Sequence, residues 1–295
     1  QLYILLVPLA LNKNRMHTIQ IAGVPEHFNY PWQLGIESGK FADAGIDLRW
    51  ANVPEGTGRL CDMLRNGETD AAVILTEGVI KDIIAGNDCS IVQVFVETPL
   101  LWGIHVAAGS PYNAVEDLID RTVAISRFGS GSHLMAIVNA KQMGWPPESL
   151  KYEVVNTIEG ASATLTNGQA DYFMWERFMT KPLVDKGIFR HLEDCPTPWP
   201  SFVIAVRNDV LQQQQVIDTM LRVINEISET IKERPTLEAE LAERYGQKVE
   251  DISEWLSKTE WSQQKLTREA FEKVQHQLFD IGIIDRKTTF ENATG

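Results

Sequence analysis

The sequence predicts an α/β protein, and three observations support that prediction. Short apolar, β-branched runs alternate with helical patterns over the first 208 residues, which is typical of parallel sheets covered by helices. One helix–turn–strand pattern occurs twice, 101 residues apart. After Asn208 the pattern becomes almost wholly helical.

The expected elements follow in chain order. Strands are expected at residues 18–24, 47–50, 71–75, 91–96, 103–107, 122–126, 151–155, 172–175 and 202–206. Helices that end near Gly or Asn are expected at residues 30–38, 57–65, 131–142 and 160–166. In the last part, isoleucines and leucines at helical spacing run from Ile217 to Ile231, and further helices are expected at residues 237–245, 249–257 and 268–281.

The repeated pattern is the most informative of the three observations. Leu64 to Ala71 recurs as Leu165 to Tyr172, each time as a helix end, an Asn-Gly turn and an Asp that opens a strand. Glycine allows such a sharp turn because it adopts positive φ without strain. We expect two α/β lobes of like construction, and the alternative is a coincidence of common turn chemistry.

Composition excludes several classes of protein. The 295 residues are 44% hydrophobic and 23% charged, so the chain can form a substantial core. A net charge of −13 argues against binding to nucleic acid or to anionic membranes. Three cysteines without metal-ligand spacing favour neither a disulfide framework nor a structural zinc site.

The first fifteen residues stand apart from the rest. Residues 2–11 are almost wholly apolar but too few to span a bilayer, so no direct membrane insertion is expected. We interpret residues 1–15 as a non-native or extension segment and Met16 as the native start; the alternatives are a signal-peptide remnant or a genuine strand. The first interpretation implies a cytoplasmic protein, whereas a removed export signal implies a periplasmic or cell-surface one.

Known catalytic and cofactor motifs are missing from the sequence. It has no His-Glu-x-x-His zinc helix, no complete phosphate or dinucleotide loop and no Gly-x-Ser-x-Gly elbow. We therefore predict no catalytic residue, metal site or cofactor.

Candidate ligand-binding residues follow the predicted strands, where open α/β sheets bind their ligands. The candidates are Glu26, His27, Phe28, Tyr30, Trp32, Thr76, Glu77, Glu97, Arg127, Ser130, Ser132, His133, Glu159, Trp175 and Glu176. Each has a structural alternative, since tryptophans are commonly core residues and histidines are commonly hydrogen-bonded within the fold. Their shared position at strand ends favours a common cleft.

The segment from Arg127 to His133 gives the strongest local signal. It is a Gly/Ser turn between a strand and a helix, and such a turn directs N–H groups and hydroxyls outward at a helix N-terminus. That arrangement binds anions. The alternative is that Ser130 or Ser132 is an N-cap.

Several of these segments together resemble the type II periplasmic-binding-protein family, in particular its sulfonate-, taurine- and thiamin-precursor-binding branch, which shares a fold with fungal thiamin-pyrimidine synthases. The resembling segments are residues 34–48, 64–72, 129–133 and 278–284. The resemblance implies two Rossmann-like lobes joined by two crossing strands near residues 97–108 and 200–206, with a helical C-terminal part. The first lobe would comprise residues 16–99 plus 206–295, and the second residues 100–205.

Departures from the synthases bear on function. The resemblance implies that the synthases use a lysine and a histidine just after the third strand, and Ile74 and Gly78 stand at those places here. Only Cys195 lies near the position of their cysteine-rich iron-binding loop. The resemblance therefore implies a non-enzymatic protein that closes around a thiamin-precursor-like heterocycle or a small sulfonate or carboxylate. Phe28, Tyr30, Trp32 and Trp175 would form its apolar walls.

Two alternatives stay open at this point: a divergent synthase-like enzyme and a cytoplasmic metabolite sensor. A membrane transporter would be a partner if the protein is exported.

Overall fold

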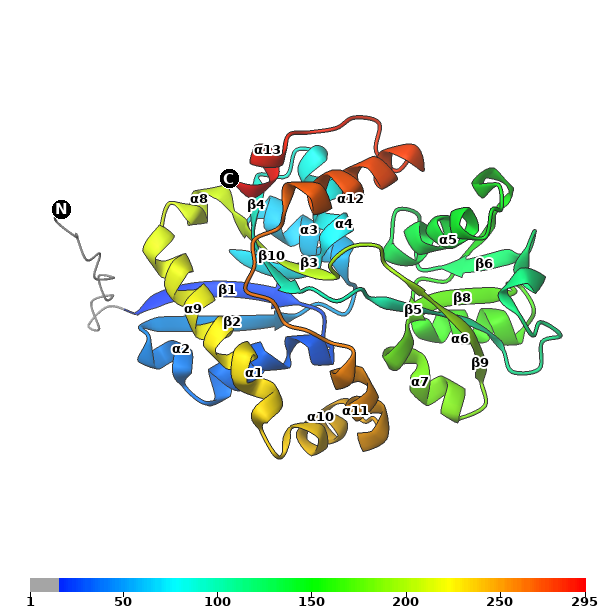
Figure 1. The fold of residues 1–295 in the computed structure, drawn as a ribbon, viewed down its shortest axis with the longest axis horizontal. Helices are drawn as coiled ribbons and strands as arrows, with labels where there is room; N and C mark the ends of the chain where they lie inside the picture. Colours follow the sequence, from blue (N-terminus) through cyan, green and yellow to red (C-terminus); the bar gives the residue numbers. More distant parts are fainter. Residues whose placement is uncertain (1–15) are drawn as a thin grey trace.

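The computed structural model describes residues 16–295, and they form two α/β lobes side by side (Figure 1). The expectation about residues 1–15 lies outside the described residues. No helix within residues 16–295 has the length and apolar character that crossing a membrane requires.

The first lobe is built on a mixed sheet in the order β2-β1-β3-β10-β4. Its strands are β1 (His17–Gly23), β2 (Ile46–Asn52), β3 (Ala71–Leu75), β4 (Cys89–Val96) and β10 (Phe202–Arg207). β1 pairs in parallel with β2 and β3, whereas β10 is antiparallel to both β3 and β4. The central strands are buried on both faces, as continuous apolar runs require.

The second lobe repeats this arrangement in the order β7-β6-β8-β5-β9. Its strands are β5 (Leu101–Ala107), β6 (Thr122–Ile125), β7 (Lys151–Val154), β8 (Tyr172–Glu176) and β9 (Phe189–Pro196). β6 is parallel to β7 and β8, and β5 is antiparallel to β8 and β9. The predicted α/β class is confirmed, but both sheets are mixed rather than parallel, because one strand in each runs against its neighbours.

The repeated sequence pattern has the same structural role in both lobes. Gly67 and Gly168 take φ of 70° and 69° at the turn, and each segment leads into the third strand of its sheet. Asp70 Oδ2 accepts a 2.8 Å hydrogen bond from the Gln20 N–H on the neighbouring strand, and Asp171 Oδ2 does the same from Thr122. The prediction of two lobes of like construction is confirmed.

The helices cover the sheets and extend into a helical C-terminal part. They are α1 (Tyr30–Glu37), α2 (Lys40–Asp43), α3 (Thr57–Asn66), α4 (Thr76–Ile84), α5 (Gly131–Gln142), α6 (Ile158–Thr166), α7 (Arg177–Asp185), α8 (Asn208–Leu211), α9 (Gln214–Thr230), α10 (Leu237–Tyr245), α11 (Val249–Ser257), α12 (Arg268–Asp280) and α13 (Phe290–Thr294). Short 3-10 turns lie at His27–Asn29, Val115–Leu118, Pro147–Ser149 and Ile231–Glu233. α9 packs on α1 and α12 packs on α4, so the C-terminal part belongs to the first lobe (Figure 1).

Two short segments connect the lobes: residues 97–100, between β4 and β5, and residues 197–201, between β9 and β10. They are tied to each other, because Leu100 N donates to Thr197 Oγ1 and Thr197 N donates to Leu100 O, both at 3.0 Å. The expected crossing at 97–108 begins with the first connection but runs on through β5, and the one at 200–206 starts late and runs into β10. The expected boundary at 205/206 falls inside β10, whose pairing with β3 and β4 places it wholly in the first sheet.

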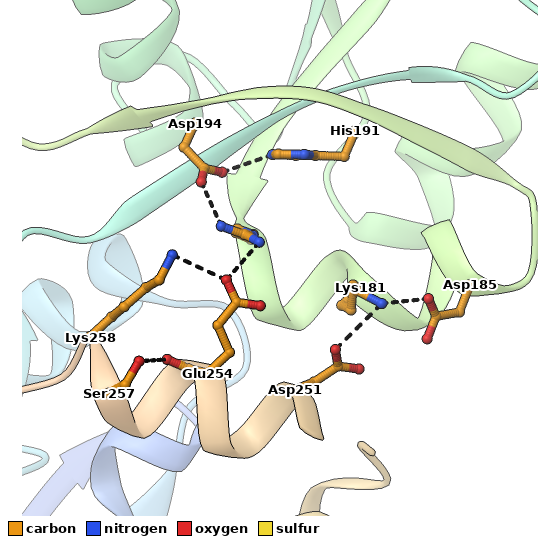
Figure 2. Close-up of polar contacts among 9 residues, drawn as sticks. Lys181, Asp185, His191, Asp194, Asp251, Glu254, Ser257 and Lys258 are labelled. Atoms are coloured by element: carbon orange, nitrogen blue, oxygen red, sulfur yellow. Dashed lines mark hydrogen bonds and ion pairs between the residues drawn. The ribbon is translucent and has the colours of Figure 1, made fainter. Parts of the chain in front are cut away.

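A polar interface between α7 and α11 also joins the lobes (Figure 2). Arg177 bonds Asp194 of its own lobe at 2.8 Å and Glu254 of the first lobe at 2.9 Å. Pro182 has no N–H to donate within α7, and the carbonyl of Phe178, four residues earlier, accepts a hydrogen bond from Gln247 of the first lobe. The proline therefore leaves a backbone acceptor available for contact between the lobes.

Candidate functional site

A cavity of about 550 Å³ lies between the two lobes. Its walls come from the carboxyl ends of β1, β3, β6 and β8, the residues that start α3, α4 and α5, and the strands β5 and β10. Leu278 and Ile283 add a contribution from the C-terminal part. The cavity thus lies where an α/β protein with facing lobes presents its strand ends.

Six acidic residues line this cavity, and the carboxyl groups of three of them have raised pKa values. Glu26 follows β1, Glu77 lies in the first turn of α4, and Glu176 ends β8. Burial raises the pKa of Glu26 and of Glu77 to about 7. Burial, helped by the charge of Glu26, raises the pKa of Glu176 to about 8.

The carboxyl groups differ in their partners. Glu77 Oε2 accepts a 2.7 Å bond from the indole N–H of Trp199, whereas its Oε1 has no partner among the described residues. Glu176 Oε2 caps α7 by accepting from Met179 N at 2.7 Å. The Glu26 carboxyl makes no hydrogen bond or ion pair within residues 16–295.

The start of α4 connects the cavity to the segments between the lobes. Thr76 Oγ1 donates to Pro200 O at 2.6 Å, and Thr76 N donates to Ser201 O at 3.1 Å. Together with the bond between Glu77 and Trp199, these contacts fix residues 197–201 against a cavity wall. A change in charge at Glu77 therefore acts directly on the second connection.

Two tryptophans form the aromatic part of the wall. Trp102 on β5 and Trp175 on β8 meet edge to face, with ring centroids 6.2 Å apart. Gly131 allows the approach of Trp102, because a Cβ there would lie 2.7 Å from the indole ring. The indole nitrogen of Trp102 is buried and has no partner among the described residues.

Arg127 and Lys81 reach across the cavity between the lobes. Arg127 Nη1 donates to Glu55 O at 3.4 Å, and its guanidinium lies over Gly58, where a Cβ would come within 2.4 Å. Lys81 Nζ donates to Gly129 O at 3.0 Å. Both cations therefore bond backbone carbonyls of the opposite lobe.

The Gly/Ser turn is largely occupied by its own hydrogen bonds. Ser130 is the N-cap of α5 and accepts from His133 N at 3.3 Å. Ser132 Oγ accepts from Ser126 N at 2.9 Å and lies 3.1 Å from Ser130 Oγ. His133 Nδ1 accepts from Gly129 N, and burial lowers the pKa of this histidine. Ser130 is therefore an N-cap, as the structural alternative held. Both Ser130 and Ser132 also line the cavity.

Of the residues proposed from sequence, seven line the cavity: Glu26, Glu77, Arg127, Ser130, Ser132, Trp175 and Glu176. The aromatic residues after β1 do not. His27 stacks on Trp255 at 4.1 Å, Phe28 packs against Phe202, and Trp32 stacks on Phe41 within the first-lobe core. This happens because the chain after β1 turns immediately into a 3-10 turn and α1, whose buried face packs inward.

The remaining candidates also lie away from the cavity wall. Tyr30 bonds Glu240, and burial together with this bond raises its pKa to about 12. Thr76 is buried against the second connection, His133 contacts the rings of Phe128 and Tyr152, and Glu97 and Glu159 are exposed.

Sequence reasoning did not propose several residues that line the cavity, among them Trp102, Lys81, Leu100, Phe202, and residues 55–62. Trp102 and Phe202 lie on the antiparallel strands next to the connections, whose position in the sheets was not anticipated. The available signal for Trp102 was its position two residues after the first connection, residues 97–100.

Comparisons with known proteins agree with this geometry. A family model described as "Ca3427-like PBP" matches residues 102–195. The structure of the Candida albicans CA3427 gene product, described as having the generic periplasmic binding protein fold, is 26% identical, with a TM-score of 0.83 over 92% of each chain. The chain has the periplasmic-binding-protein fold. It shares this fold with the CA3427 gene product, which confirms the fold that the resemblance predicted.

More distant structures share this fold. The alkanesulfonate-binding protein SsuA from Xanthomonas axonopodis pv. citri, bound to MOPS, is 15% identical, with a TM-score of 0.80 over 95% of this chain and 99% of that chain. The ligand-binding component of an ABC-type import system from Staphylococcus aureus is 14% identical, with a TM-score of 0.76 over 95% and 97%. No curated protein sequence matches the chain significantly. Both structures share the fold of this chain over nearly its whole length.

Proposed function

We propose that this periplasmic-binding-protein-like chain is a non-enzymatic protein that closes its two lobes around one small molecule. The proposal rests on the cavity between the lobes, which has wall residues from both lobes and buried polar atoms without a partner among residues 16–295. Native proteins satisfy nearly all such atoms, so a bound molecule is the natural partner.

The contacts across the cavity support closure by hinge motion. Arg127 and Lys81 each bond a carbonyl of the other lobe, and the two connections are short. Lobes joined by two short segments move chiefly by rotation about those segments. Opening would break the two cationic contacts and expose the carboxyl groups and the tryptophans.

Two ligand classes belong to this proposal: a thiamin-precursor-like heterocycle and a small sulfonate or carboxylate. The first matches the acidic, aromatic wall, and the second matches Arg127 and the serines. Ile74 and Gly78 line the cavity at the positions discussed above for the synthases, which supports binding over synthase chemistry. Where the protein is exported, a membrane transporter is the proposed partner.

Native mass spectrometry of the purified protein, followed by small-angle scattering before and after ligand removal by unfolding and refolding, tests this function. We expect a retained small molecule and an increase in radius of gyration on its removal. A protein that retains nothing and keeps one radius of gyration with and without candidate ligands would contradict the proposal.

A further inference from the structure

Glu77 and Trp102 line the cavity, and each has a buried polar side-chain atom without a hydrogen-bond partner among residues 16–295. One of these atoms is an acceptor and the other is a donor. Glu77 is 3% exposed, and its Oε1 accepts no hydrogen bond within the described chain. Trp102 is 4% exposed, and its indole N–H has no acceptor there. A carboxyl oxygen requires a donor and an indole N–H requires an acceptor, so a complementary ligand offers both.

Glu77 is one of three carboxyl groups in the cavity wall that have a raised pKa and no ion-pair partner among the described residues. Glu26 and Glu176 line the same cavity as Glu77, and no lysine, arginine or histidine of residues 16–295 forms an ion pair with any of the three. Three cationic residues also line the cavity: Arg127 and Lys81 bond backbone carbonyls of the opposite lobe, and Arg59 forms an ion pair with Glu68. An anionic group placed against these carboxyl groups would oppose their ionisation, whereas a cationic group would favour it.

We propose that the ligand presents a cationic or donor-rich nitrogen group, such as an amidinium or an amino-heterocycle, to Glu26, Glu77 and Glu176. This inference rests on the proposed binding function and narrows its ligand class. Small sulfonates and carboxylates are disfavoured at this wall. The group donates to Glu77 Oε1, and an acceptor on the same ligand receives the Trp102 N–H.

The aromatic wall indicates the body of the ligand. Trp102 and Trp175 provide flat apolar surface beside the carboxyl groups, which suits a planar ring and allows cation–π attraction when that ring is charged. A volume of about 550 Å³ is within the range of small-molecule sites.

Matched probes on one ring test the proposal. Benzamidine and benzenesulfonate share a phenyl ring and carry end groups of opposite charge, and 4-aminopyrimidine supplies a neutral donor and acceptor. Binding of each at millimolar concentration is measured by ligand-observed NMR and by thermal shift. The proteins are the wild type, Glu77→Gln, Glu26→Gln and, as a matched control with an exposed carboxyl outside the cavity, Glu159→Gln.

We expect benzamidine or 4-aminopyrimidine to bind the wild type and Glu159→Gln alike, and to bind Glu77→Gln about tenfold or more weakly, as loss of a charge-assisted hydrogen bond predicts. Glu26→Gln, whose carboxyl has no bond within the fold, keeps the test valid if Glu77→Gln unfolds, and it should show the same direction.

The other outcomes separate the inference from the function on which it rests. Preferential binding of benzenesulfonate, abolished by Arg127→Ala, overturns the inference and leaves the binding function intact. Failure of all three probes, while the purified protein retains a small molecule in native mass spectrometry, also overturns the inference alone. Failure of all probes with nothing retained overturns both.

Discussion

Replacing Glu77 by glutamine should stabilise the ligand-free protein at alkaline pH and have little effect at acid pH. Burial raises the pKa of Glu77 from 4.5 to about 7, so the folded state binds a proton more tightly than the unfolded state does. Between these two pKa values the folded protein holds more protons, and its stability therefore falls as pH rises. Glutamine keeps an oxygen for the Trp199 N–H and carries no titrating proton.

The size of this effect follows from the shift. At about 1.4 kcal/mol per pKa unit, the shift corresponds to roughly 3 kcal/mol of stability lost once the pH exceeds the folded pKa. About 1 kcal/mol of this is already lost near pH 5, so the variant should gain roughly 2 kcal/mol relative to the wild type between about pH 5 and about pH 8.5. For a chain of this size, that gain raises Tm by about 5 °C.

Thermal unfolding of ligand-free wild type, Glu77→Gln and Glu159→Gln at the two pH values measures the effect. The Glu159→Gln control should follow the wild type at both, because its carboxyl is exposed. A Tm difference between Glu77→Gln and wild type that is the same at both pH values, or larger at the acid one, would refute the reasoning.

Three further predictions concern closure and packing. Arg127→Ala should weaken the binding of any cavity ligand about tenfold in calorimetry and change the Tm of the ligand-free protein by no more than about 2 °C. Unchanged affinity together with a large loss of stability would contradict the role of Arg127 across the cavity. Arg177→Ala removes a half-buried bridge between the lobes, so it should lower the free energy of unfolding by about 1–3 kcal/mol and increase the radius of gyration. Loss of the exposed Lys258 side chain should lower the free energy of unfolding by less than about 1 kcal/mol. Equal effects of the two changes in urea unfolding would count against the bridge. Gly160→Ala places a Cβ 2.1 Å from the carbonyl oxygen of Val155 and should lower the free energy of unfolding by about 1–3 kcal/mol. Gly109→Ala, with open space around it, serves as the control. Equal Tm values for the two variants would show that the backbone adjusts freely.

The sequence predicted most of the elements because their ends carry clear signals. β3 begins and ends at the expected residues, as do α10 and α11. β9 was missed because its sequence mixes charged and apolar residues, as an edge strand allows, and ends at Pro196. α7 was missed because Pro182 lies within it, and a proline inside a helical pattern normally indicates a helix end.

The site was less predictable, because the strand-end rule gives a position along the chain but not the direction of a side chain. It identified Glu26, Glu77 and Glu176, which lie at the ends of β1, β3 and β8 and line the cavity. It failed for His27 and Trp32, since the chain turns into a helix directly after β1 and buries them. Whether such a residue faces the cavity or the core depends on packing between elements that are distant in sequence.

The placement of Glu77 explains how binding and closure depend on one another. One oxygen of this carboxyl holds Trp199 in the second connection, and the other has no partner among the described residues, on a side chain that lines the cavity between the lobes. A donor that bonds the free oxygen stabilises the ionised carboxyl, and an ionised carboxyl accepts the indole N–H more strongly than a protonated one does. Ligand contact therefore strengthens the bond that fixes residues 197–201 against α4. A ligand without such a donor contacts the cavity wall but does not strengthen the bond between Glu77 and Trp199. Such a ligand should therefore shift the protein less far toward the closed state than a ligand of equal affinity that carries the donor.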